Sequence, residues 1–221
     1  MNNQEVFLSD DSSNEEILAG CDKLRVDDYF DWSDDDDKRI SNGDWMTGNI
    51  MDRAGMLLKK QFPSIRGLQT SLFGSGPSKF QSRLKDFKED RLQMHNDGEH
   101  HWVLSRSLGE KIKLYDSSKD EPTENLKEQL RKCYGSCVGK KGKLEVKYES
   151  VCRQDGAKDC GIFTIAFSTD IAFGNDPANI FYNQTLFRVH LKNCFKSEKM
   201  APFPRLLSSD CEKTLSKTIF I

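Results

Sequence analysis

The stretch CGIFTIAFSTDIAF, residues 160–173, is the part of this sequence that decides its fold. A helix of this composition is apolar on nearly every side, and such a helix is stable only in the interior of a domain. Asp159 precedes the stretch as a candidate N-cap, and Gly174 follows it at a place where helices commonly end. The sequence therefore predicts a buried central helix that begins at Cys160 and is covered by the rest of the chain.

The segments around this helix carry patterns typical of further helices and of strands. Apolar side chains recur at helical spacing in three of them, residues 49–60, 121–134 and 184–195. Strand patterns bounded by turn residues occur in four others, residues 92–95, 102–108, 111–115 and 144–149. This combination predicts an α+β fold, in which helices flank one central mixed or antiparallel sheet.

Composition divides the 221 residues into a globular part and two extensions. Residues 1–40 hold 13 acidic and 4 basic side chains and few apolar ones, so we expect a mobile acidic tail. Residues 41–197 carry all of the predicted elements and have the size of one domain. Residues 198–221 contain Pro202 and Pro204 and show no clear period, which predicts a C-terminal tail.

Several classes of protein are excluded by what the sequence lacks. Its apolar stretches are far shorter than the roughly 20 residues of a membrane span, and its start shows no secretion signal. Seven cysteines without a CxxC pair indicate reduced thiols rather than a disulfide framework or a zinc site. His100 and His101 are neighbours that a strand would point to opposite faces, so no metal or cofactor is expected. We expect an intracellular protein, in the nucleus or the cytoplasm.

Cys160 is the candidate for chemistry, because it lies in the first turn of the central helix. Free backbone N–H groups and the positive end of the helix dipole stabilise a thiolate there, which makes a nucleophile. A cysteine in an apolar helix is more often only part of the core, and the other six cysteines keep that structural interpretation. A catalytic interpretation therefore requires a base and a group that orients the base.

His101 and Asp116 are candidates for those two roles. His101 directly precedes one predicted strand and Asp116 ends the next, so an antiparallel hairpin brings the two side chains together. The carboxylate would then accept a hydrogen bond from the imidazole and set its tautomer. His95 and His100 are alternative bases, whereas His190 lies on a later helix and is interpreted as structural.

Gln154 completes the set, six positions before Cys160 across a polar turn. Its side-chain amide would donate a hydrogen bond to an oxyanion that forms at the nucleophile. The alternative for Gln154 is an ordinary polar loop residue, and for Asp116 it is a turn cap.

These residues occur in an order that resembles a known family. The blocks are His101-Trp102, then LYDS (residues 114–117), then Gln154 followed after four residues by Asp159-Cys160-Gly161. They resemble the ubiquitin-like-protein (SUMO or sentrin-specific) cysteine proteases, which are relatives of the adenoviral protease. The upstream block WMTGNIM, residues 45–51, resembles the opening of their domain. The stretch AFGNDP, residues 172–177, is similar to uncharacterised animal members, some of them associated with transposons.

The resemblance implies a papain-like cysteine protease fold of the ubiquitin-like-protease type, with the nucleophile at the start of the buried helix. It implies four roles: Cys160 as nucleophile, His101 as general base and acid, Asp116 as orienting group, and Gln154 as part of the oxyanion hole. The first turn of the helix would supply the second oxyanion donor, the backbone N–H of Cys160.

The same resemblance implies a substrate. In the family two tryptophans clamp the thin Gly-Gly end of the modifier, and Trp45 and Trp102 occupy the matching positions. The alternative for Trp45 is a core anchor beside the first helix. Gly48 stands where family members usually carry an aspartate that helps to hold the modifier, so the identity of the modifier stays open.

The expected function is a thiol protease that cuts the peptide or isopeptide bond after the C-terminal glycine of a ubiquitin-like modifier, SUMO or NEDD8-like, through a thioester. Such an enzyme would act as a monomer on the modifier or its conjugates, in processing or deSUMOylation. The alternatives are an inactive binding module of the same fold and an acyltransferase with the same triad. Neither a membrane nor a nucleic acid is expected as partner, since residues 41–221 carry 29 basic and 22 acidic side chains without a DNA-binding motif.

Overall fold

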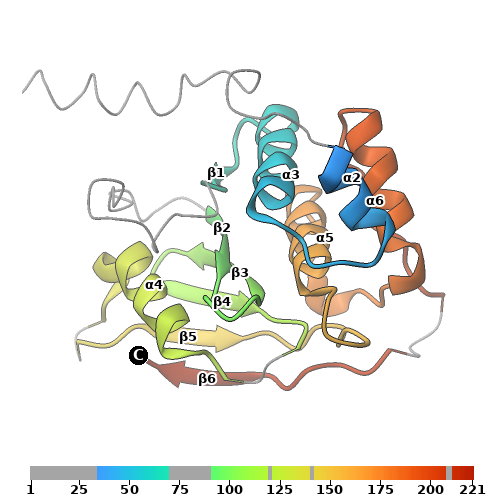
Figure 1. Ribbon diagram of the computed structural model, residues 1–221. Helices are drawn as coiled ribbons and strands as arrows, with labels where there is room; N and C mark the ends of the chain where they lie inside the picture. Colours follow the sequence, from blue (N-terminus) through green and yellow to red (C-terminus); the bar gives the residue numbers. More distant parts are fainter. Residues whose placement is uncertain (1–33, 70–90, 119–120, 140–141, 208–210) are drawn as a thin grey trace, which may run out of the picture. The chain divides into compact units, whose positions relative to one another are not determined.

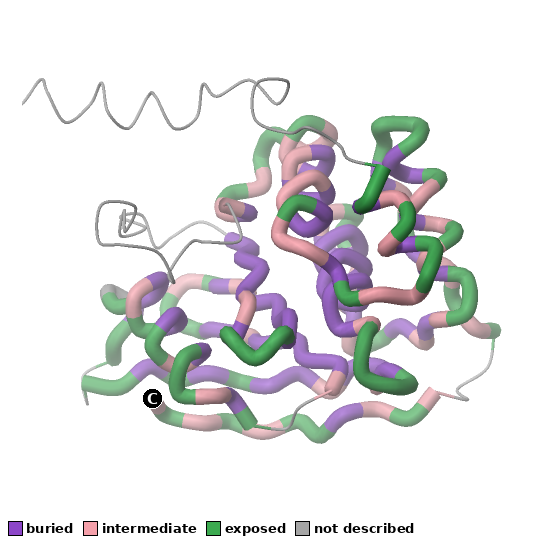
Figure 2. Tube along the Cα trace, viewed as in Figure 1, coloured by how far each residue is buried: buried purple, intermediate pink, exposed green. Residues whose placement is uncertain are grey.

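The computed structural model describes residues 34–69, 91–118, 121–139, 142–207 and 211–221. At the centre lies helix α5, Cys160–Ala172, in which every residue from the first to Ile171 is buried. The helix contacts strand β3 and helices α3 and α6. Figure 2 shows buried residues along its length. The prediction of a buried central helix is therefore confirmed.

Six strands form one sheet, in which they lie side by side in chain order (Figure 1). The strands are β1 (Arg66–Gly67), β2 (Arg91–Asn96), β3 (Trp102–Leu108), β4 (Lys111–Tyr115), β5 (Glu145–Tyr148) and β6 (Lys217–Phe220). β2, β3 and β4 form the antiparallel meander that their turn residues predict. β1 pairs with β2 and β4 pairs with β5 in parallel, whereas β5 and β6 are antiparallel. The sheet is therefore mixed, and the α+β prediction is confirmed.

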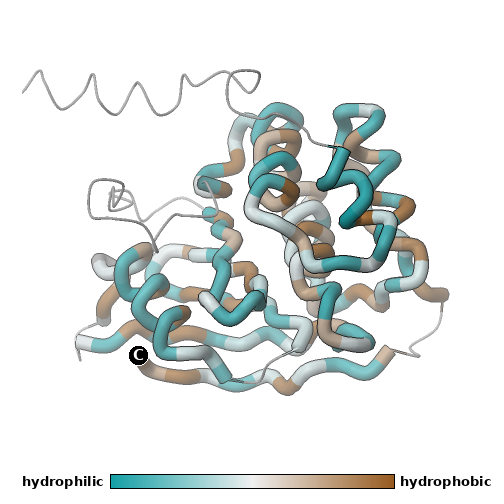
Figure 3. Tube along the Cα trace, in the orientation of Figure 1, coloured by the Kyte–Doolittle hydropathy of each residue, from teal (hydrophilic) through white to brown (hydrophobic). Residues whose placement is uncertain are grey.

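Helices cover both faces of this sheet. They are α2 (Asp34–Ser41), α3 (Gly48–Gln61), α4 (Glu124–Tyr134), α5 and α6 (Phe187–Lys196), with the short 3-10 turns η3 (Gly135–Cys137), η4 (Pro177–Asn179) and η5 (Gln184–Leu186). One apolar cluster joins α3, α5 and α6 to the sheet, and a second joins α4 to it. Val103 belongs to the α4 cluster and Leu104 to the α5 cluster, because successive residues of a strand point to opposite faces. Figure 3 shows most of α2 and α4 as hydrophilic, as expected of helices that cover a core from outside.

The acidic segment is ordered where it meets the domain. We expected a mobile acidic tail here, but Asp34–Ser41 forms helix α2, which contacts α6. Ile40 is fully buried, and the hydroxyl of Thr47 donates a hydrogen bond of 2.9 Å to the buried carboxylate of Asp36. The four aspartates lie in the first turn, where the positive end of the helix dipole stabilises negative charge. The prediction of a tail is wrong for this helix, and residues 1–33 lie outside the described residues.

The C-terminal segment is part of the domain rather than a tail. β6 pairs with β5 and so satisfies backbone groups that would otherwise form an open edge. Phe203 is buried in the cluster around α5, and Arg205 forms an ion pair of 2.6 Å with the buried Asp170. The expected boundary after residue 197 is therefore wrong, because this segment contributes both a strand and core side chains.

Cys152 and Cys211 are joined by a disulfide, which the expectation of seven reduced thiols did not include. The two residues are 59 positions apart, and they meet because Cys152 forms a β-bridge with Lys213. The disulfide ties the C-terminal segment to the turn that leads to Gln154. The free cysteines among the described residues are all buried, and they are Cys133, Cys137, Cys160 and Cys194.

No helix in the described part of the chain is long and apolar enough to cross a bilayer. Within the same residues, no group of three or more His, Cys, Asp and Glu side chains is arranged to hold a metal ion.

Candidate active site

Cys160 is the first residue of helix α5, and it lies in a closely packed part of the domain. The residue is fully buried, and its thiol donates to the carbonyl oxygen of His100 at an Sγ···O distance of 3.7 Å. A Cβ on the following Gly161 would lie 2.6 Å from the Cβ of Met46 and 3.1 Å from the Cδ1 of Trp102. The close approach of these two side chains to the start of the helix therefore depends on glycine.

His101 and Asp116 meet at one end of the β3–β4 hairpin. His101 directly precedes β3 and Asp116 directly follows β4, and the register pairs Leu104 with Tyr115. The Nε2 atom of His101 lies 2.8 Å from the Oδ1 atom of Asp116, and both side chains are buried. The backbone N–H of Ser118 donates to the same carboxylate oxygen at 2.9 Å. The structure thus brings the predicted pair together, with the carboxylate held from two sides.

The pKa of the His101 imidazole is raised from 6.5 to about 9. Burial by itself lowers this pKa, because an apolar surrounding disfavours the imidazolium. Hydrogen bonds and charge interactions with Asp116 and Cys160 act in the opposite direction and outweigh burial. Since Nε2 faces Asp116, Nδ1 is the ring nitrogen left for the thiol. Imidazole, carboxylate and thiol therefore form one connected group at the start of α5.

The alternative histidines do not occupy this position. His95 is buried between Gln129 and Ser105, at 3.2 and 2.7 Å. Burial lowers its pKa to about 4, and the hydrogen bond to Gln129 offsets only part of that effect. His100 is exposed and its φ is 62°, a left-handed backbone that costs about 1 kcal/mol or more outside glycine. His190, on α6, bonds a backbone carbonyl at 3.0 Å, in keeping with the structural interpretation.

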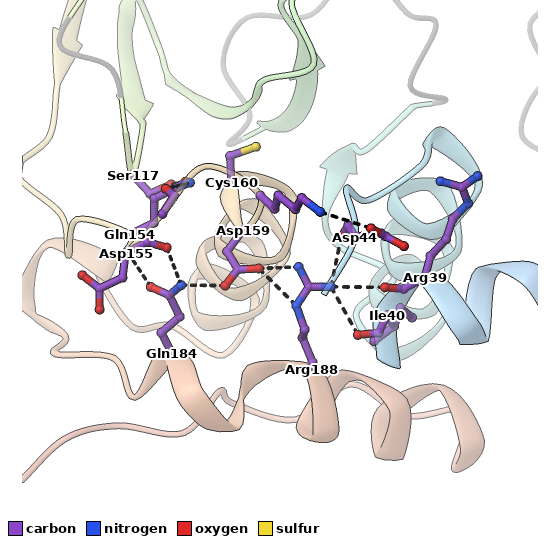
Figure 4. A network of polar contacts seen from close by, with 12 residues as sticks. Arg39, Ile40, Asp44, Ser117, Gln154, Asp155, Asp159, Cys160, Gln184 and Arg188 are labelled. Carbon is purple, nitrogen blue, oxygen red and sulfur yellow. Dashed lines mark hydrogen bonds and ion pairs between the residues drawn. The ribbon is translucent and has the colours of Figure 1, made fainter. Parts of the chain in front are cut away.

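Gln154 is held in place by the residue that follows Asp116. The hydroxyl of Ser117 donates to the Oε1 atom of Gln154 at 2.7 Å, and the Gln154 backbone N–H donates to the Ser117 carbonyl at 2.9 Å. One N–H of the side-chain amide donates to the carbonyl of Gly156 at 2.9 Å. Figure 4 shows Gln154 and Ser117 together on one side of the start of α5, near Cys160. The amide group has two donors, so a second N–H is left for another acceptor.

The two tryptophans that the resemblance assigns to substrate binding have different surroundings. Trp102 is buried, and its indole N–H donates to the carbonyl of Met46 at 3.0 Å. Trp45 is 37% exposed, and its ring centroid lies 6.1 Å from that of His100. The two indoles therefore differ in exposure, and the clamp itself stays a prediction. Trp102 packs closely against Gly161. The ring next to Trp45 is that of the exposed His100.

Asp159, the residue before the thiol, is bound by two side chains from the η5–α6 region (Figure 4). It occupies the N-cap position of α5, but its side chain makes no capping hydrogen bond, which corrects the interpretation of Asp159 as a cap. Arg188 forms an ion pair with its Oδ1 atom, and Gln184 donates to its Oδ2 atom at 2.6 Å. Arg188 also donates to three backbone carbonyls, those of Arg39, Ile40 and Asp44.

Sequence reasoning missed Gln184 and Arg188 and the position of His100 opposite Trp45. Arg188 lies on the polar stripe of a helical pattern, which predicts only exposure to solvent. Gln184 starts the same pattern and carries no signal of its own. Nothing in their spacing points to Asp159, so these contacts become visible only in the folded chain.

The comparisons with known proteins find the fold in solved structures alone. No protein-family profile matches the sequence, and no curated protein matches it. The SUMO protease Ulp1 with its catalytic cysteine oxidised to a sulfinic acid matches with a TM-score of 0.60 and 13% sequence identity, over 86% of this chain and 97% of that chain. The Ulp1 protease domain in complex with Smt3, the yeast ortholog of SUMO, matches with a TM-score of 0.55 and 16% identity, over 74% of this chain and 82% of that chain. The chain therefore has the Ulp1 protease fold, which confirms the fold that the resemblance implies.

Proposed function

We propose that this protein is a thiol protease, which hydrolyses the peptide or isopeptide bond after the C-terminal glycine of a ubiquitin-like modifier. The observation that carries the proposal is the buried His101–Asp116 pair beside Cys160, at the start of the central helix. The structural neighbours are SUMO proteases, and one of them is bound to Smt3. That likeness supports a modifier as the substrate class.

The first half of the proposed reaction forms a thioester. In its neutral form His101 takes the proton of the Cys160 thiol, and the sulfur attacks the carbonyl carbon of the terminal glycine. A C–S bond forms while the carbonyl electron pair moves onto oxygen. His101 then gives its proton to the amine nitrogen as the C–N bond breaks. Asp116 stabilises the imidazolium between the two proton transfers, which agrees with the raised pKa of His101.

The second half releases the modifier with a free carboxylate. Water attacks the thioester carbon, His101 accepts the proton of the water, and the C–S bond breaks as that proton returns to sulfur. In both halves the negative oxygen would accept hydrogen bonds from the Cys160 backbone N–H and from the free N–H of the Gln154 amide. Ser117 holds this amide by its other end, so the donor is oriented before the substrate arrives.

A glycine tail fits the surroundings of the thiol. Cys160 has no exposed surface in the free protein, and its thiol donates to the backbone carbonyl of His100. We infer that a substrate enters beside His100 and the exposed ring of Trp45, whose ring centroids lie 6.1 Å apart. A chain without side chains requires the smallest opening there, which favours glycine at the cleaved bond.

Covalent probes test the nucleophile and the substrate together. We would treat the protein with ubiquitin, SUMO and NEDD8 that carry an electrophile at the C-terminus, and detect adducts by mass spectrometry. We expect an adduct with at least one modifier, its loss in Cys160→Ala, and its retention in Cys194→Ala, which removes another buried free cysteine.

The absence of adducts from a folded wild-type protein would contradict the proposal. Specific binding of a modifier without any adduct would favour the binding module. Transfer of an acetyl group from acetyl-coenzyme A that depends on Cys160 would favour the acyltransferase.

A further inference from the structure

Arg188 connects the segment that carries Trp45 to the residue before the nucleophile. From α6, its guanidinium pairs with the Asp159 carboxylate on one side and donates to the carbonyls of Ile40 and Asp44 on the other, at 3.2 and 3.0 Å (Figure 4). Trp45 directly follows Asp44. The residues that precede the exposed tryptophan and the thiol are thus held by one side chain.

The contacts of Arg188 need a guanidinium in particular. Its planar fork presents five N–H donors, and here they serve one carboxylate, two backbone carbonyls at the end of α2 and the carbonyl of Asp44 in the loop that follows. The last carbonyls of a helix have no partner within the helix, so a cation that binds them also interacts favourably with the helix dipole. An ammonium group cannot reach both sides in this way. Arg188 is therefore suited to hold two separate backbone segments at a set distance.

A second link between the same segments is weaker. Lys158 forms an ion pair of 3.2 Å with the side chain of Asp44. Both side chains are more than 40% exposed, and such pairs contribute at most about 1 kcal/mol. The side chains of Arg188 and Asp159 are only 17% and 18% exposed. The less exposed Arg188 link is the one that sets the geometry.

We propose that Arg188 is a positioning residue, which fixes the Trp45 segment relative to Cys160 and balances the charge of Asp159 beside the thiol. The inference rests on the proposed function, because Arg188 would control how wide the passage is that the glycine tail of the modifier enters. Asp159 is the closest carboxylate to Cys160 in sequence, and an unpaired negative charge at that distance opposes formation of a thiolate. Gln184 holds the other carboxylate oxygen but brings no charge.

The charged and titratable groups around Cys160 come from four sides. His101 and Asp116 lie at the ends of β3 and β4, and His100 lies in the loop before β3. Asp159 and its partner Arg188 lie at the start of α5 and on α6, and Lys158 with Asp44 bridges the two loops. Among these groups, Arg188 forms an ion pair with Asp159 alone. Removal of Arg188 therefore leaves the negative charge of Asp159 without its cation next to the thiol.

The test compares Arg188→Met with Lys192→Met. Lys192 lies one turn further along α6 and also binds α2, through Asp37 and Ser41, but it does not contact Asp159. Arg188→Lys keeps the charge without the fork, and the double variant Arg188→Met/Asp159→Asn removes both charges. Thermal unfolding of each variant identifies any that has lost its fold.

Three readouts separate positioning from a general structural role. Hydrogen exchange of residues 42–47 reports the Trp45 segment. The pH profile of Cys160 alkylation by iodoacetamide, mapped by peptide mass spectrometry, reports the charge beside the thiol. The kcat and KM for a modifier with a fluorogenic amide after its last glycine report the passage.

We expect Arg188→Met to speed exchange in residues 42–47, to move the alkylation profile to higher pH, and to lower kcat/KM about tenfold to a hundredfold, mainly through KM. The double variant should recover the pH profile but not the slow exchange, and Arg188→Lys should do the same. Lys192→Met should match wild type in all three readouts.

Unchanged exchange and an unchanged pH profile in Arg188→Met would overturn the inference, as would equal effects in Lys192→Met. Exchange and alkylation need no modifier. If no modifier is cleaved, the proposed function fails while these two readouts still decide the role of Arg188.

Discussion

His95 and His101 lie six residues apart and at the same end of the β2–β3 pair, yet the fold gives them opposite properties. Both are buried, and burial alone lowers the pKa of each imidazole. His95 has only the neutral partners Gln129 and Ser105, and its pKa falls to about 4. His101 has a carboxylate and a thiol beside it, and its pKa rises to about 9.

The difference shows what separates a core histidine from one that can carry a proton near neutral pH. Hydrogen bonds satisfy both rings, so hydrogen bonding as such does not decide the outcome. The kind of partner decides it, because hydrogen bonds and charge interactions with a carboxylate and a thiol outweigh burial at His101, whereas the amide of Gln129 offsets burial only in part at His95. Exchanging these partners between the two sites is therefore the direct test of the comparison.

The largest effect is expected for Asp116→Asn, which gives His101 a neutral partner like that of His95. The amide cannot stabilise the imidazolium, so the pKa of His101 should fall well below 9. Turnover of a modifier substrate should fall about 10⁴-fold, as in other triads whose aspartate is replaced by asparagine. NMR titration of the ring and steady-state kinetics measure the two effects. A variant that keeps both the high pKa and full turnover would show that Asp116 is only a turn residue.

The next largest effect is expected in the pH dependence of the free energy of unfolding, which should decrease both below and above about pH 6.5. Below this pH the unfolded chain protonates its histidine while native His95 stays neutral down to about 4, so acid removes stability. Above it, native His101 keeps a proton up to about 9 that the unfolded chain has released, so alkali removes stability as well. Each limb should have a slope of about 1.4 kcal/mol per pH unit from its histidine.

Urea denaturation between pH 4 and 9 measures both limbs. His95→Gln should flatten the acid limb and leave the alkaline one, and Asp116→Asn should do the reverse. A variant that flattens the wrong limb would contradict the assignment of that limb to its histidine.

A smaller effect is expected for Gln129→Glu, which places a carboxylate beside His95. The pKa of His95 should rise from about 4 by one unit or more, because the imidazolium gains an opposite charge. The new carboxylate also loses the donor that Gln129 offers to the carbonyl of Asn96 at 2.6 Å, so some stability should be lost. NMR titration checks the shift. An unchanged pKa would mean that burial dominates at this site whatever the partner.

The smallest effect is expected for Ser105→Ala. Its hydroxyl lies 2.7 Å from the Nε2 atom of His95 and 2.6 Å from the hydroxyl of Tyr134. Loss of this neutral contact should lower the free energy of unfolding by about 1 kcal/mol. The pH profile of turnover should not move, because the network does not touch His101. A shifted profile would show that the two histidine sites are coupled.

The main elements and the central pair of the site could be predicted from the sequence, since they depend on local pattern. A thirteen-residue helix that is apolar on nearly every side is stable only inside a domain, so α5 could be placed before any contact was known. A short turn between two alternating segments makes a hairpin, and a hairpin leaves one position for His101 and Asp116 relative to each other. The polar turn before Cys160 is short, so it likewise keeps Gln154 close to the thiol.

The errors arose where contacts between distant residues decide the outcome. A run of four aspartates is typical of a solvated tail, but Ile40 and Asp36 find buried positions against the domain and order the helix. The C-terminal segment has no clear period, but the open edge of β5 pairs with it. The distant Cys152 and Cys211 form a disulfide because a β-bridge brings their backbones together.

The sequence by itself determined the buried helix, the hairpin and the residues able to form the nucleophile, the base and its carboxylate, because these follow from periodicity and from short turns. Only the tertiary structure decided that Trp102 is buried while Trp45 is exposed. It also decided that Arg188 binds both Asp159 and backbone carbonyls that lie 144 to 149 positions before Arg188 in the sequence. The physical reason is that such contacts depend on the angles and distances at which whole elements pack. No local pattern of side chains encodes those quantities.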